Sequence, residues 1–140
     1  MGSLHDKLQE QIAQLRLNDY ITLCGRSNNI MDVYPEYSLH IMSSRYEGQP
    51  MTLIEAQACG LPSVVFNFKF GAADIVRNGV NGIIVEQNDC KAFCEALCTM
   101  MSSEDMRKAY GENALEVGKQ YFKNNVFSKW IELLEFISKA

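Results

Sequence analysis

Short apolar runs alternate with longer amphipathic stretches along most of this chain. Four runs have the length and composition of buried strands, namely 20–25, 38–44, 63–68 and 82–86. Strands that are covered by helices on both faces read as continuous apolar runs, and such strands occur in parallel sheets. The pattern therefore predicts an α/β fold with a doubly wound, Rossmann-like parallel sheet.

The segments around these runs carry helical spacing and helix boundary signals. Ser3 is a candidate N-cap for a first helix, and Pro50 and Gly60 mark the start and the stop of another. The expected helices are 3–17, 27–37 (short, and disturbed by Pro35), 50–60, 71–79, 88–103, 103–121 and 124–140. A doubly wound domain usually opens with a strand, whereas this chain opens with a helix. We therefore expect that a first strand is missing and that residues 1–140 are part of a longer protein.

Length, composition and charge narrow the function classes. The chain has 140 residues, 47% of them hydrophobic and 21% charged, as expected for one globular domain. Its net charge of −4 argues against a nucleic-acid or anionic-membrane partner. No apolar run approaches the ~20 residues of a membrane span, and the start "MGSLHDKLQ" has no signal-peptide pattern. We expect a cytoplasmic protein.

Three of the five cysteines recur every four residues, at Cys90, Cys94 and Cys98. On a helix they would form one stripe, which could bind a metal or lie beside a core stripe made by Phe93, Leu97 and Met101. We favour reduced thiols next to the core, because no histidine or CxxC motif lies near. No metal site is predicted.

Familiar catalytic and nucleotide-binding motifs are absent from the sequence. It contains no GxxxxGK[ST] loop, no GxGxxG after a strand and no Asp-x-Asp pair. His5 and His40 stand alone, the first on an expected exposed helix face and the second inside a predicted strand. His40 is therefore expected to be packed or hydrogen-bonded rather than to act as a ligand.

The segment "SRYEGQPMTLIEAQACGLPSVV" (44–65) places Glu47 and Glu55 on either side of a helix start, with seven residues between them. The amides of Met51 and Thr52, just after Pro50, lack intrahelical partners and favour an anion. Carboxylates beside a phosphate would bind the hydroxyls that flank it, and a nucleotide-sugar has that layout. The alternative is that both acids are solvated surface residues.

This segment closely resembles the signature of the family 4 glycosyltransferases, retaining enzymes with the two-domain GT-B architecture. The resemblance continues through "GAADIVRNGVNGIIV", "LRLNDYITLCGR" and "YSLHIMSS". It implies that 1–140 is an incomplete C-terminal, donor-binding domain. The N-terminal acceptor domain and the first strand, just upstream of Gly2, would be missing. It implies transfer of a sugar from a nucleoside diphosphate to an acceptor with retention, without a metal or other cofactor. The chain alone would be inactive.

The resemblance also implies roles for individual residues. Glu47 would be catalytic, meeting the donor sugar near the reacting centre, and Glu55 would bind the ribose hydroxyls. The other donor-binding positions would be Gly25 and Arg26 near the nucleobase, the backbone of Met51, Thr52 and Leu53 at the diphosphate, and Gly48 and Gly71 in the donor loops. The chain departs from the family at Phe70 and Asp74, where Gly and Glu are common. The family's basic pair on the diphosphate would come from before this chain, which leaves Arg26 and Arg45 as the nearest cations.

The partners that the resemblance implies are a nucleotide-sugar donor and an acceptor held by the missing N-terminal domain. The transferred group would be a hexose or an N-acetylhexosamine, in polysaccharide or glycolipid biosynthesis. The full-length protein would be cytoplasmic, with a peripheral position at the inner membrane face. Two alternatives stay open: another enzyme of this architecture, such as a nucleotide-sugar epimerase or a phosphorylase, and a non-catalytic nucleotide-binding module. An exposed, unpaired sheet edge argues against the module.

Overall fold

The computed structural model describes residues 2–139, which fall into two compact units that meet between Ile30 and Met31. The first unit contains helix α1, His5–Gln14. This helix is shorter than predicted: its N-cap position is Leu4, without a side-chain capping bond, so the predicted Ser3 cap is wrong. It ends before Arg16, whose φ of 56° lies outside the right-handed helical region.

The predicted strand at 20–25 is absent from the structure. Ile21 and Thr22 are exposed, and no residue from Ile21 to Gly25 pairs with a strand in the described part of the chain. A β-strand exists only through hydrogen bonds to a neighbouring strand. The apolar composition of this segment is therefore not sufficient to make it a strand by itself.

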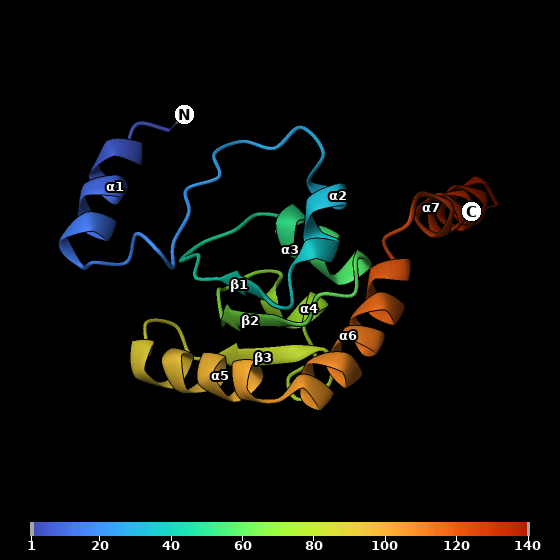
Figure 1. Ribbon diagram of the computed structural model, residues 1–140. Helices are drawn as coiled ribbons and strands as arrows, with labels where there is room; N and C mark the ends of the chain where they lie inside the picture. The colour runs from blue at the N-terminus through green and yellow to red at the C-terminus, as the bar shows by residue number, and fades with distance from the viewer. Residues whose placement is uncertain (1, 140) are drawn as a thin grey trace. The chain divides into compact units, whose positions relative to one another are not determined.

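The second unit is built on a parallel sheet with the order β1-β2-β3. The strands are β1 (His40–Met42), β2 (Ser63–Phe66) and β3 (Gly82–Val85), and their arrows run in the same direction in Figure 1. Met42 lies opposite Val65 across the first pair, and Phe66 lies opposite Val85 across the second. The other three predicted strands are thus confirmed, with shorter bounds.

The helices after α1 follow the predicted order. They are α2 (Ile30–Val33), the 3-10 helix η1 (Tyr34–Glu36), α3 (Met51–Ala58), α4 (Ala72–Ile75), α5 (Cys90–Ser102), α6 (Glu104–Lys119) and α7 (Lys123–Ser138). Asp89 caps α5 by accepting a hydrogen bond from the Ala92 amide at 2.9 Å. Gly60 ends α3 as predicted, because its φ of 76° suits a glycine.

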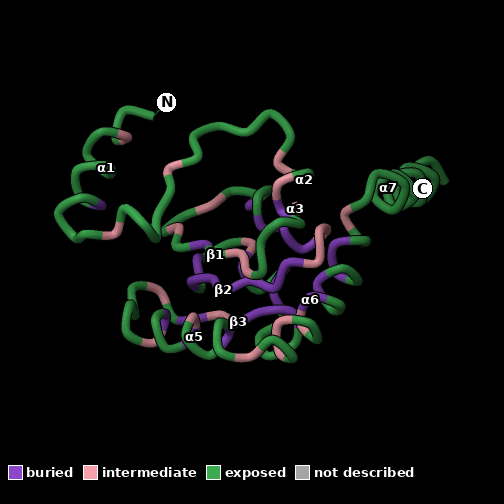
Figure 2. The backbone as a smooth tube through the Cα atoms, in the orientation of Figure 1, coloured by how far each residue is buried: buried purple, intermediate pink, exposed green. Residues whose placement is uncertain are grey.

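Two apolar clusters cover opposite faces of the sheet. Val65 belongs to the cluster that α3 and α4 complete, whereas Val64 and Phe66 belong to the cluster that α5 completes. Successive residues of a strand point to opposite faces. The continuous apolar run 63–66 is therefore buried on both sides, and the doubly wound fold class is confirmed (Figure 2).

The prediction that Met101 belongs to the core face of α5 is wrong. Met100 is fully buried, whereas Met101 is 68% exposed. The buried positions of α5 are Phe93, Ala96 and Met100, spaced by three and four residues, so that Met101 lies one step around the helix from this face. Cys90, Cys94 and Cys98 are exposed free thiols. Within residues 2–139 no group of three or more His, Cys, Asp and Glu is placed to hold a metal ion.

Helix α6 crosses α3 through glycines. A Cβ atom on Gly118 would lie 2.5 Å from Ala58 Cα and 2.6 Å from Ala58 N, and one on Gly111 would lie 2.6 Å from the Gly60 carbonyl oxygen. These are backbone atoms, which cannot rotate away. The two helices therefore approach closely because α6 has no side chain at these two positions.

A chain of buried polar side chains joins α3 to the start of all three strands. Gln57 donates to Ser63 Oγ at 2.9 Å and accepts from Asn81 Nδ2 at 2.6 Å. Ser63 Oγ also lies 3.3 Å from His40 Nδ1, and Asn81 donates to the Ile75 carbonyl at 3.0 Å. These contacts satisfy polar groups that would be costly to bury alone, and they fix α3 relative to the sheet.

His40 gives this network a pH dependence. Burial lowers the pKa of His40 from 6.5 to about 4. At a pH between these values the unfolded chain binds the proton more readily than the folded chain does, so stability should fall as the pH falls. The loss should reach up to about 3 kcal/mol near pH 4, relative to pH 7. Replacing His40 with Asn, which keeps a hydrogen-bonding group and cannot titrate, should remove this component when unfolding is measured at several pH values. Equal acid sensitivity of the two proteins would contradict the prediction.

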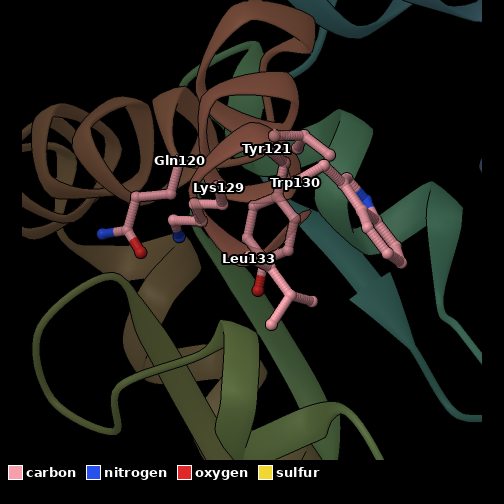
Figure 3. A pocket seen from close by; sticks show the side chains of 6 residues that line it. Gln120, Tyr121, Lys129, Trp130 and Leu133 are labelled. Carbon is pink, nitrogen blue, oxygen red and sulfur yellow. The ribbon is translucent and has the colours of Figure 1, made fainter. Parts of the chain in front are cut away.

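Helix α7 contributes no buried residue. Its exposed large apolar side chains are Val126, Phe127, Trp130, Ile131, Leu133, Leu134, Phe136 and Ile137. Tyr121, just after α6, and Trp130 of α7 help to line an open cavity of about 290 Å³ (Figure 3). None of the described helices has both the length and the apolar composition that a bilayer crossing needs.

Candidate functional site

Two loops leave the sheet at the same end of its strands. Residues 43–50 follow β1 and lead into α3, and residues 67–71 follow β2 and lead into α4. Because β1 and β2 are parallel neighbours, both loops start at the carboxyl ends of their strands. In an open α/β sheet a ligand crevice forms at the carboxyl ends of the strands.

The first turn of α3 presents one amide without an acceptor. The Met51 amide donates to the Gln49 carbonyl at 2.8 Å, and the Leu53 and Ile54 amides donate to the Pro50 carbonyl at 3.1 and 3.2 Å. Thr52 is exposed, and among the described backbone hydrogen bonds its amide has no acceptor. The helix dipole favours an anion at this end, and the Thr52 amide is the donor that can bind it.

Glu47 lies half-buried in the loop between β1 and α3. Its carboxylate makes no hydrogen bond or ion pair with any residue from 2 to 139. Gly48, next to it, is exposed, and a Cβ at this position would meet no atom within 4 Å. The carboxylate is therefore free to accept hydrogen bonds from a bound hydroxylated molecule.

Glu55 is half-buried on α3, on the side where η1 packs. The Tyr34 hydroxyl donates to the Thr52 carbonyl at 3.1 Å and so connects η1 to the first turn of α3. Burial raises the pKa of Tyr34, and the nearby Glu55 carboxylate raises it further. Tyr34 therefore stays protonated at neutral pH and holds this turn in place. Sequence reasoning missed Tyr34, since a tyrosine before a proline carries no motif.

Gly71 brings the second loop against the start of α3. Its φ is 92°, and a Cβ at this position would lie 2.8 Å from Pro50 Cδ and 3.0 Å from Pro50 Cγ. Both the backbone conformation and the close approach require a glycine. The predicted site residue Gly71 thus lies beside the first turn of α3.

An aromatic contact joins the same two loops. The rings of Tyr46 and Phe70 meet edge to face, with centroids 6.4 Å apart and an interplanar angle of 89°. Lys69 Nζ lies 5.2 Å from the centroid of the Phe70 ring. Sequence reasoning noted Phe70 only as a departure from a family pattern and did not identify Tyr46 or Lys69. Only the folded chain brings positions 46 and 70 together.

Most of the predicted site residues lie close together within the second unit. The second unit holds Glu47, Gly48, Met51, Thr52, Leu53, Glu55 and Gly71 on two adjacent loops and one helix. Leu53 is fully buried, so that only its backbone could face a ligand. Gly25 and Arg26 belong to the first unit.

The sequence and the structure are both similar to known proteins. Residues 1–117 match the family described as Glycosyl transferases group 1. An exopolysaccharide phosphotransferase of Streptomyces coelicolor is 32% identical over 140 residues, which are 99% of this chain and 15% of that protein. The amylovoran biosynthesis glycosyltransferase AmsD of Erwinia amylovora is 30% identical over 133 residues, covering 95% of this chain and 37% of AmsD.

The structure of the chain is also similar to solved structures. The chain superposes on an S. aureus TarM variant in complex with fondaparinux, α-GlcNAc-glycerol and UDP with a TM-score of 0.86, at 25% identity, over 94% of this chain and 27% of that one. A glycosyltransferase from Rickettsia africae gives a TM-score of 0.85 at 27% identity, over 98% of this chain and 38% of that one. The chain thus spans well under half the length of these relatives.

Proposed function

Because the chain belongs to the Glycosyl transferases group 1 family, we propose that residues 1–140 are the donor-binding part of a longer GT-B glycosyltransferase of family 4. The full-length protein transfers a sugar from a nucleoside diphosphate to an acceptor, with retention of the anomeric configuration. The observation that carries this proposal is the first turn of α3. It holds a free Thr52 amide with Glu47 before it and Glu55 after it, at the carboxyl ends of the strands.

In this proposal the diphosphate of the donor lies at the Thr52 amide and the positive end of the α3 dipole. Charge accumulates on the diphosphate as the sugar leaves, and a fixed donor at that position lowers the barrier without having to reorganise. Glu47 accepts hydrogen bonds from the sugar hydroxyls, and Glu55 accepts them from the ribose. Neither acid touches the phosphates, because a carboxylate would repel them. No metal takes part.

The relatives support the donor class. AmsD is a biosynthetic glycosyltransferase, and the TarM variant was crystallised with UDP. Uridine diphosphate sugars are therefore the first donors to test, with a hexose or an N-acetylhexosamine as the transferred group. The acceptor is held by the part of the longer protein that lies outside residues 1–140, and the chain alone transfers no sugar.

A donor screen on the full-length protein tests the proposed function. Binding of uridine, guanosine and adenosine diphosphate sugars is measured by calorimetry, and release of the nucleoside diphosphate is measured with and without candidate acceptors. We expect one nucleotide class to bind and its release to depend on the acceptor, with the anomeric configuration of the product read by NMR. Sugar conversion without an acceptor would indicate an epimerase, phosphate-dependent cleavage a phosphorylase, and binding without turnover a non-catalytic module.

A further inference from the structure

Two contacts with the loop 67–71 flank Glu47 in the loop that carries it. At its end, the Pro50 ring approaches Gly71 so closely that a Cβ on Gly71 would lie 2.8 Å from Pro50 Cδ. Near its middle, the Tyr46 ring contacts the Phe70 ring at 6.4 Å between centroids. Glu47 lies between these two contacts, and its own carboxylate has no partner among the described residues. These two contacts therefore restrain the loop on both sides of this carboxylate.

The two rings are unusually exposed for a packing contact. Tyr46 is 70% exposed and Phe70 is 50% exposed, and neither belongs to the apolar clusters of the sheet. Such a pair buries little apolar area and contributes little to the hydrophobic part of the folding free energy. Its contact is specific all the same, because edge-to-face geometry aligns the positive edge of one ring with the negative face of the other. The Lys69 ammonium, 5.2 Å from the Phe70 centroid, adds a second contact to the same ring.

We propose that Tyr46 and Phe70 are positioning residues that hold the loop carrying Glu47 against the loop carrying Gly71. The proposal rests on the proposed function, since it concerns the acid at the sugar end of the donor site. Tyr46 acts because it adjoins Glu47 in the chain, and Phe70 acts only through Tyr46. The Glu47 carboxylate then stays in the position that the departing sugar requires. A small displacement of this carboxylate would lower the rate, because the reaction depends on the orientation of the groups around the sugar.

The experiment is a double-mutant cycle on the full-length protein, with kcat and donor KM measured at saturating acceptor. Tyr46→Ala and Phe70→Ala should each lower kcat about three- to tenfold, with a smaller change in donor KM. The double variant should match either single variant, since the second substitution removes a contact that is already lost. Tyr46→Phe keeps the ring and should restore kcat.

Two controls separate positioning from a general loss of structure. Tyr37→Ala removes another exposed tyrosine, one that precedes β1 at the opposite edge of the sheet, and should leave kcat unchanged. The melting temperatures of the ring variants should stay within a few degrees of that of the unsubstituted protein.

Several outcomes would overturn the proposal while leaving the proposed function intact. In the first, the protein is active and the losses of kcat from the two ring substitutions multiply in the double variant. In the second, the substitutions raise only donor KM, because the rings touch the substrate. In the third, the substitutions change neither kcat nor donor KM. A full-length protein that binds no nucleotide-sugar and transfers none would overturn the proposed function, and this inference with it.

Discussion

Glu47→Gln in the full-length protein is expected to lower kcat by about 10- to 100-fold, with a smaller change in donor KM. Positive charge develops at the anomeric carbon as the bond to the diphosphate breaks, and Glu47 lies at that end of the proposed donor site. A hydrogen bond to a charged group is worth about 1.5–3 kcal/mol, and one that strengthens in the transition state appears in turnover. Steady-state kinetics with varied donor would measure it.

Glu55→Gln should act differently. The ribose takes no part in bond breaking, so the hydrogen bonds of Glu55 are equal in the ground state and the transition state. Donor KM should rise about tenfold while kcat changes little. A reversed pattern would mean that the donor lies the other way round on α3.

Glu112→Gln is the matched control for both substitutions, because Glu112 is an exposed acid on α6, far along the chain from the loops of the site. It should behave as the unsubstituted protein. Unsubstituted kinetics in both Glu47→Gln and Glu55→Gln would show that the two acids are solvated surface residues.

The second large effect is expected on stability. Gly118→Ala should lower the free energy of unfolding by about 3 kcal/mol or more, because the new Cβ would lie 2.5 Å from Ala58 Cα. Helix propensity alone predicts the opposite sign, a gain of about 1 kcal/mol when a glycine inside a helix becomes alanine. Denaturant unfolding of the full-length protein decides between the two signs.

Two further variants test the cause. Ala58→Gly should fail to rescue Gly118→Ala, since the clash is with backbone atoms of residue 58 and not with its side chain. Glu112→Ala, on an exposed position of the same helix, should stay within about 0.5 kcal/mol of the unsubstituted protein. A stabilised Gly118→Ala variant would mean that α3 and α6 do not pack as closely as described.

Local signals in the sequence were enough to predict the second unit. The apolar runs that became β1, β2 and β3 and the Pro50 and Gly60 boundaries of α3 all depend on neighbours within a few residues. The pairing of Glu47 with Glu55 around a helix start is also a local feature. Such signals survive in a single sequence, because backbone geometry and capping act over one or two turns.

Apart from the Ser3 cap of α1, which is a local feature, the predictions that failed are those in which a distant partner decides. The run 20–25 has the composition of a strand but no strand beside it, and Met101 has the composition of a core residue but the wrong angle on α5. In both cases burial or pairing is a property of what lies opposite, which the local pattern does not contain.

The sequence by itself determined the doubly wound class, most of the helix boundaries and the two acids around α3. Only the tertiary structure placed Gly71 against Pro50, Tyr46 against Phe70 and Gly118 against Ala58. Each of these contacts joins residues that are 21 to 60 positions apart in the chain. The packing role of these side chains, and of the missing side chain of each glycine, exists only when folding brings the segments together. The close packing of the interior then makes one added methyl group, or one missing ring, matter.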